Sequence, residues 1–210
     1  MAQIRNDQHV FIAGATGSGK TFLAKTYLAG NTKKVFVLDT KGTFEWEQIP
    51  EKLIITITRI AQIQNATQNF HFIIYRPVHE ELDQIYYDLF FKFCYDLRHC
   101  TVYVDEAMQV CPNSFKIPEY YKGILTRGRE LDVNVWSCTQ RPATLPVVIY
   151  SEAMHWFIFK LNALQDRKKI ADYSGFTGFM RVLPQHEFMY VDIESGRPPQ
   201  QGKLTVKKGG

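Results

Sequence analysis

The sequence predicts an α/β fold with a mainly parallel central sheet flanked by helices. Strand-like apolar runs alternate with helix-length segments along most of the 210 residues, the order that places helices against a parallel sheet. The composition agrees, because 45% hydrophobic and 22% charged residues are typical of globular domains and not of disordered chains or coiled coils. The length suits one domain, placed over residues 1–194 and followed by a partly mobile tail over 195–210.

The first half of the chain contains four expected strands and two expected helices. A helix is expected from about Lys20 to Gly30, since glycine readily takes the left-handed conformation that ends a helix. Residues 80–98 are expected to form a long helix, because apolar side chains recur there at helical spacing. The expected strands are residues 10–13, 35–38, 53–57 and 70–75.

The second half continues the alternation and places polar residues where strands end. Asp105 follows one expected strand, and Gln140 follows another. Because parallel strands end at the same edge of a sheet, these side chains are expected to gather at a ligand site there. The expected strands are residues 101–104, 133–138, 155–161 and 187–193, and the expected helices are 118–130 and 166–173.

Charge, hydropathy and cysteine content narrow the class of protein. The net charge of +4 permits an anionic partner without requiring one. No apolar run approaches the roughly 20 residues that cross a bilayer, and the N-terminal residues lack the order of a signal peptide. We therefore expect an intracellular protein that is not itself transmembrane. The cysteines lack metal-binding spacing and are expected to be free, buried thiols at Cys94, Cys100, Cys111 and Cys138.

A glycine-rich motif lies between the first expected strand and the first expected helix. It matches the pattern GxxxxGK[ST] and consists of Gly14, Ala15, Thr16, Gly17, Ser18, Gly19, Lys20 and Thr21, which we call the phosphate-binding loop. In this pattern backbone N–H groups surround a polyphosphate, Lys20 faces the β- and γ-phosphates, and the Thr21 hydroxyl is a ligand of Mg²⁺. A glycine turn that binds nothing does not need the Lys-Thr pair. ATP and Mg²⁺ are therefore the expected cofactors.

An acidic pair at the end of another buried strand is the expected second part of the site. We expect Asp105 to hold Mg²⁺ through water. Glu106, the next residue, is then placed to act as general base on the attacking water. The alternative, a solvated acidic strand end, is disfavoured by the phosphate-binding loop upstream.

Three further candidates lie near the next strand. Gln140 ends that strand and is expected to sense the γ-phosphate. Arg127 and Arg129 flank Gly128 near the end of the expected helix 118–130, where either is a candidate arginine finger for a neighbouring subunit's nucleotide. Arg129 is slightly preferred because it is closer to the next strand. A solvated helix end, with cations near its negative dipole, is the alternative for both.

Taken in order, these motifs resemble those of the HerA and FtsK superfamily of DNA-pumping ATPases. The matching segments span roughly residues 8–145 and are the phosphate-binding loop, Leu38-Asp39-Thr40-Lys41-Gly42, Asp105-Glu106, Arg127-Gly128-Arg129 and Thr139-Gln140-Arg141-Pro142. One departure is Thr40, where many relatives have proline. The resemblance implies a P-loop NTPase fold of the catalytic-glutamate class, in which an additional strand separates the phosphate-binding-loop strand from the Asp105 strand.

Within this superfamily the chain most resembles the genome-packaging ATPases of icosahedral viruses with an internal membrane, since it has no room for the extra modules of larger members. That resemblance implies an ATP-driven motor that assembles as a homo-oligomeric ring and pumps double-stranded DNA into a preformed capsid. Capsid or membrane-vertex proteins are the implied further partners. The implied locations are the host cytoplasm and the virion.

The residues alone leave other functions open. A small-molecule or nucleoside kinase has a similar length. Glu106 argues against a kinase, because a kinase gains from excluding water from its site and not from activating it. A GTP switch is disfavoured because no Asn-Lys-x-Asp stretch is present. A nucleotide-binding assembly protein, which uses ATP only to order a ring, is the non-enzyme alternative. Basic residues that could contact DNA have the alternative of being ordinary solvated surface charges. They are Arg167-Lys168-Lys169, Lys116, Lys122 and Lys207-Lys208.

Overall fold

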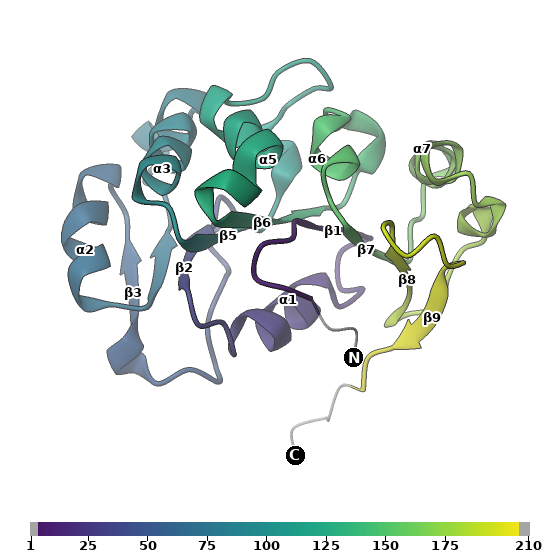
Figure 1. The fold of residues 1–210 in the computed structure, drawn as a ribbon, viewed down its shortest axis with the longest axis horizontal. Coiled ribbons are helices and arrows are strands. Elements are labelled where there is room, and N and C mark those ends of the chain that lie inside the picture. The colour runs from purple at the N-terminus through teal and green to yellow at the C-terminus, as the bar shows by residue number, and fades with distance from the viewer. Residues whose placement is uncertain (1–3, 206–210) are drawn as a thin grey trace.

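The computed structural model describes residues 4–205 and arranges them around one nine-stranded sheet (Figure 1). The strand order is β3-β4-β2-β5-β6-β1-β7-β8-β9. The strands from β3 to β7 in this order pair in parallel, and β8 and β9 add two antiparallel pairings at one end. The predicted α/β fold with a mainly parallel sheet is confirmed. The strands are β1 (Val10–Ala13), β2 (Lys34–Leu38), β3 (Ile54–Ile57), β4 (Phe72–Tyr75), β5 (Cys100–Val104), β6 (Val133–Thr139), β7 (His155–Phe159), β8 (Glu187–Asp192) and β9 (Gln200–Lys203).

Helices cover both faces of the sheet, with α1 on one face and α3, α5 and α6 on the other (Figure 1). Successive side chains of β1 show why both faces are covered. Phe11 and Ala13 belong to the core on one face, whereas Val10 and Ile12 belong to the core on the other. A strand buried on both faces is apolar at nearly every position, as β1 is. The helices are α1 (Lys20–Leu28), α2 (Ile63–Asn69), α3 (Gln84–Leu97), α4 (Ala107–Val110), α5 (Glu119–Leu131), α6 (Val148–Ser151) and α7 (Leu164–Ser174).

Strand β6 lies between β1 and β5 and pairs in parallel with both. The additional strand predicted between the phosphate-binding-loop strand and the Asp105 strand is therefore confirmed. We call the edge at which the parallel strands end the carboxyl edge, and the edge at which they begin the amino edge. The phosphate-binding loop, Asp105 and Gln140 all follow strand ends at the carboxyl edge.

Some element bounds differ from the sequence-based expectation for local reasons. The helix expected over 80–98 begins at Gln84, because the Asp83 side chain caps it by accepting the N–H of Ile85 at 2.8 Å. The strand expected over 155–161 ends at Phe159, and the Lys160 carbonyl beyond it accepts a hydrogen bond from the phosphate-binding loop. Helices α2, α4 and α6 were not predicted. They have 7, 4 and 4 residues, too few for helical periodicity to be visible.

The segment after Ser195 contains strand β9, which was not predicted. Its sequence, Gln-Gln-Gly-Lys, has no apolar alternation, but it pairs with β8 in antiparallel register, with Phe188 opposite Gly202. Beyond it, the Leu204 N–H donates to the His186 carbonyl at 2.9 Å. That the tail is partly mobile stays a prediction, and Lys207-Lys208 lies outside the described residues.

Two expectations from composition also concern the fold. All four cysteines are buried and free, as predicted: Cys94, Cys100, Cys111 and Cys138. Among residues 4–205, no helix combines the length and the apolar character needed to span a membrane.

Candidate nucleotide-binding site

The phosphate-binding loop connects β1 to α1 at the carboxyl edge, and the strands on either side of β1 fix where it starts. The Gly14 N–H donates to the Thr139 carbonyl at the end of β6 at 3.1 Å, and the Ala15 N–H donates to the Lys160 carbonyl after β7 at 2.7 Å. A Cβ at Gly14 would lie 2.5 Å from Phe159 Cβ, so only glycine fits there. The loop is held by strands that are remote in sequence.

The middle of the loop has the backbone shape of an anion cradle. Gly17 and Gly19 have φ angles of 69° and 109°, in the left-handed region that favours glycine. Between them the buried Ser18 hydroxyl has no hydrogen-bond partner. On the outer side, the Gln185 amide donates to the Gly17 carbonyl. Left-handed glycines on either side of an unpartnered buried hydroxyl fit a loop that binds a polyphosphate.

Lys20 opens α1 and is buried, with 6% of its surface exposed. Its ammonium donates to the carbonyls of Gly14 and Ala15 at 2.7 and 3.0 Å, both within the loop itself. The positive charge of Lys20 therefore already lies within the phosphate-binding loop, where two carbonyl oxygens bind it and a phosphate could replace them as the acceptor. This arrangement fits the predicted contact of Lys20 with the β- and γ-phosphates.

We expect Lys20→Ala to weaken ATP binding by at least about 30-fold, the effect of deleting one partner of a buried charge pair. Titration calorimetry with Mg·ATPγS measures the loss, and a thermal unfolding curve checks that the variant folds. Lys92→Ala is the matched control, because Lys92 is half-exposed on α3, where it pairs with Asp96 and lies over the Tyr120 ring. Near-normal ATP hydrolysis by Lys20→Ala would refute the site.

The donor set for Mg²⁺ is a hydroxyl facing a carboxylate. The Thr21 hydroxyl donates to Asp105 Oδ1 at 3.2 Å, and the Tyr103 hydroxyl donates to the same oxygen at 2.8 Å. Burial, followed by the charges of Cys138 and Asp105, raises the pKa of Tyr103 well above its usual value, so the phenol stays a neutral donor. Within residues 4–205 no cluster of three or more His, Cys, Asp or Glu side chains is placed to hold a metal. A hydroxyl and a carboxylate oxygen are donors that suit Mg²⁺, an ion that takes its other ligands from water and phosphate.

Glu106 is buried beside Asp105, with 1% of its surface exposed, and both of its oxygens have partners. Oε2 accepts from the Lys41 ammonium at 2.8 Å, and Oε1 accepts from the Gln140 N–H at 3.1 Å. The same ammonium lies 4.0 Å from Asp105 Oδ2. Burial opposes the charge on Lys41, but the hydrogen bond and the charge of Glu106 outweigh it and raise the pKa of Lys41. One lysine thus offsets part of the charge of two buried carboxylates.

Gln140 bridges the two halves of the site. Its backbone N–H donates to Glu106, and its side-chain carbonyl accepts from the Thr16 hydroxyl of the phosphate-binding loop at 2.7 Å. Any shift of the loop on nucleotide binding therefore reaches the end of β6 directly. This geometry fits the role of γ-phosphate sensor predicted for Gln140.

The loop that carries Lys41 is anchored by Asp39, whose contribution the sequence analysis missed. This buried carboxylate accepts the N–H groups of Gly42, Thr43 and Phe44 at 2.9, 3.2 and 3.0 Å. The Arg76 guanidinium adds an ion pair with Asp39 at 2.9 Å. An aspartate three residues before a glycine at a strand end was the available signal for such a turn. The partner Arg76 has no local signal.

Arg127 and Arg129 lie far from the other candidates in the same subunit. Helix α5 ends at Leu131 and β6 begins at Val133, so both arginines are at the amino edge, about 20 Å from Gln140 along β6. Arg127 donates to the Tyr95 hydroxyl at 3.3 Å, and Arg129 pairs with Glu194 at 2.6 Å. The structure does not bring either arginine to its own subunit's site, so a role in hydrolysis requires a neighbouring subunit.

No protein-family model matches the chain, and no curated protein matches its sequence. Solved structures do match it. The genome-packaging NTPase B204 of Sulfolobus turreted icosahedral virus 2, in complex with sulfate, has a TM-score of 0.77 at 17% identity, covering 97% of this chain and 100% of B204. The DNA-packaging ATPase B204 of Sulfolobus turreted icosahedral virus has a TM-score of 0.74 at 17% identity, covering 95% and 98% of the two chains.

VirB4 of Thermoanaerobacter pseudethanolicus is similar as well, with a TM-score of 0.70 at 10% identity, covering 99% of this chain and 94% of VirB4. At these identities the likeness establishes a common fold. The predicted resemblance to packaging ATPases and their relatives is confirmed at that level, and so is the P-loop NTPase fold.

Proposed function

We propose that this protein is a Mg²⁺-dependent ATPase. The observation that carries the proposal is the meeting, around the end of β6, of the phosphate-binding loop, the Thr21–Asp105 pair and the buried Glu106. The fold supports it too, because B204 has been solved in complex with ATP-gammaS and AMPPCP.

Each residue has a defined task in this proposal. The loop N–H groups and Lys20 bind the phosphates. Thr21 and Asp105 would hold Mg²⁺, and the ion would supply positive charge to offset the charge that develops on the phosphate oxygens. Glu106 accepts the proton of the attacking water. Before it can do so, its hydrogen bond to Lys41 must lengthen or break, because both oxygens of Glu106 already accept hydrogen bonds and one must become available to the water.

We further propose that the ATPase is a homo-oligomeric ring motor that translocates double-stranded DNA, as in viral genome packaging. The likeness to DNA-packaging B204 supports this proposal, and so does the placement of both arginines away from their own subunit's nucleotide. The basic run Arg167-Lys168-Lys169 offers less charge to DNA than its sequence suggests. Arg167 donates to the carbonyls of Leu161, Asn162 and Met180, so its guanidinium holds the fold together and is not free for DNA.

We expect duplex DNA to stimulate ATP turnover and to do so independently of sequence. Affinity for duplex should fall at least about tenfold between 50 and 200 mM salt, because each neutralised phosphate releases counterions. Phosphate release, measured with and without linear duplex at several salt concentrations, tests both points. No stimulation and no duplex binding at about 50 mM salt with ATPγS present would contradict the motor.

The same assay distinguishes the alternatives. A kinase would transfer the γ-phosphate to a small acceptor and ignore DNA, which is disfavoured by Glu106 beside the Mg²⁺ donors. An assembly protein would bind ATPγS and form rings without turnover. The motor alone combines turnover, assembly and stimulation by duplex.

A further inference from the structure

The last turn of α5, which carries both arginines, packs closely against the residue that precedes β1. Gly128 lies between the arginines, and a Cβ there would be 2.4 Å from both His9 Cε1 and the Val133 carbonyl. Burial lowers the pKa of His9 to about 4, so the ring is neutral and its Nδ1 accepts the Val135 N–H at 2.9 Å. Glycine at this position lets the helix end touch His9 while Arg127 and Arg129 stay at the surface.

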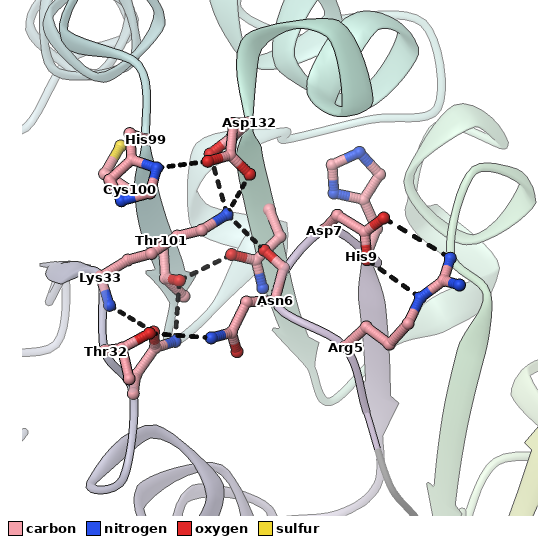
Figure 2. Close-up of polar contacts among 12 residues, drawn as sticks. Arg5, Asn6, Asp7, His9, Thr32, Lys33, His99, Cys100, Thr101 and Asp132 are labelled. Carbon is pink, nitrogen blue, oxygen red and sulfur yellow. Dashed lines mark hydrogen bonds and ion pairs between the residues drawn. The ribbon is translucent and has the colours of Figure 1, made fainter.

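An ion pair between the buried ammonium of Lys33 and the half-exposed carboxylate of Asp132 lies immediately beyond that turn, and we call Lys33, Asp132 and His99 the amino-edge clamp (Figure 2). The Lys33 side chain is 6% exposed, and its ammonium donates to Asp132 Oδ1, to the Asp132 carbonyl at 3.1 Å and to the Asn6 carbonyl at 2.6 Å. His99 contacts the other carboxylate oxygen of Asp132. Hydrogen bonding by Lys33 and then by His99 lowers the pKa of Asp132, which keeps this carboxylate charged.

The clamp acts directly on the backbone that carries the arginines. Asp132 is the C-cap of α5, with φ of 54°, and its N–H donates to the Arg129 carbonyl at 3.3 Å. The His99 N–H donates to the Leu131 carbonyl at 3.2 Å. The ion pair therefore fixes the left-handed turn that ends α5, together with the final carbonyls of the helix.

A requirement for stability alone does not explain this choice of residues. Burying the Lys33 ammonium costs several kcal/mol, and an apolar side chain of similar volume at such a position often stabilises a fold equally well. What the ammonium adds is a link between segments, because it donates at once to the Asn6 carbonyl and to the carbonyl and carboxylate of Asp132. The clamp ties the N-terminal segment, the loop before β2, the turn before β5 and the end of α5 into one geometry at the amino edge.

We propose that Lys33 and Asp132 are positioning residues, which hold the last turn of α5 so that its arginine reaches the nucleotide of the neighbouring subunit. The inference rests on the proposed ATPase ring. It requires that a substitution in the clamp lower the rate of hydrolysis at the neighbouring subunit's site and leave the rate at the subunit's own site unchanged. A purely structural role would impair both sites alike.

Mixed rings test this directly. The donor subunit carries Lys20→Ala, so it hydrolyses nothing itself but presents its arginines. The acceptor subunit carries Arg127→Ala and Arg129→Ala and keeps an intact phosphate-binding loop. Hydrolysis by the mixture then comes only from interfaces at which a donor's arginine meets an acceptor's phosphate-binding loop. Lys33→Met is added first to the donor and then, separately, to the acceptor.

We expect Lys33→Met in the donor to lower hydrolysis by the mixture about 10- to 100-fold, the effect of misplacing a catalytic group by about 1 Å. The same change in the acceptor should leave the rate within about twofold, because that subunit has no arginine to misplace. Lys34→Met is the matched control. Lys34 is the next residue, and its ammonium donates to the Phe70 carbonyl at 2.6 Å, away from α5.

Equal losses in donor and acceptor would overturn the proposal, as would no loss in the donor. If Lys33→Met folds poorly, Asp132→Asn replaces it, since asparagine tolerates the left-handed turn and removes only the charge. A smaller loss, confined to the donor, is then expected. Failure of the proposed function gives a different result. A wild-type protein without ATP turnover refutes the ATPase. If the wild type is active but donor and acceptor with an intact Lys33 co-assemble without hydrolysing ATP, the trans arginine is refuted, and the clamp's role with it.

Discussion

Glu106→Gln is expected to bind Mg·ATP and to hydrolyse it about 10² to 10⁴ times more slowly than the wild type, the contribution of a general base. The substitution preserves volume at a buried position, and the amide oxygen of the new side chain can still accept the Gln140 N–H. What it removes is the ability to take a proton from water. Single-turnover hydrolysis, alongside a binding titration with Mg·ATPγS, separates the chemical step from binding.

Asp105→Asn is the informative comparison for this result, because Asp105 faces the Thr21 hydroxyl and has a different task from Glu106. Its loss should weaken Mg²⁺-dependent nucleotide binding, whereas Glu106→Gln should not. If Glu106→Gln turns over normally while Asp105→Asn fails to bind, then Glu106 is not the base. The carboxylates would then share a role in metal binding only.

Removing the trans arginine is expected to have the largest effect on turnover, about 10³- to 10⁵-fold, with nucleotide affinity nearly intact. The reason is geometric, because both arginines are at the amino edge and touch nothing in their own subunit's site. Arg127→Ala and Arg129→Ala, assayed separately for turnover and ATPγS binding, identify which one acts. A surface charge without this role would change the rate only slightly.

Two further observations test that arginine prediction. The specific activity of the wild type should rise with protein concentration as rings form. An arginine-less subunit and a Lys20→Ala subunit, each inactive alone, should recover hydrolysis when mixed, because the second lends its arginine to the first. Mixtures that co-assemble without recovery would count against a trans arginine.

Arg129 must also leave its ion pair with Glu194 if it is the arginine that acts. That pair is half-exposed, so it costs little to break. Arg127 would give up its hydrogen bond to the Tyr95 hydroxyl. Neither contact prevents an arginine from reaching across a subunit interface.

Local spacing was sufficient to predict the parts of the site that are contiguous in the chain. The phosphate-binding loop is recognisable because glycines, Lys20 and Thr21 must follow one another for the backbone to turn and the helix to start. Apolar runs predicted the parallel strands, since strands buried on both faces are apolar at most positions. They failed for β9, which lies at the end of the sheet and is held by its pairing with β8.

The resemblance predicted that one strand separates β1 from the Asp105 strand, but only the tertiary structure decided the rest of the strand order and the partners of the candidate catalytic groups. Lys41 meets Glu106 across 65 positions of sequence, and Gln185 meets Gly17 across 168. The two arginines follow the Asp105 strand in sequence, yet α5 returns the chain to the amino edge before β6 begins. The physical reason is that strand order is set by non-local pairing and by the packing of helices over both faces, whereas sequence patterns report only the periodicity and turn chemistry of each segment. The sequence therefore determined the chemical groups this protein carries, and the sheet determined which of them can act together.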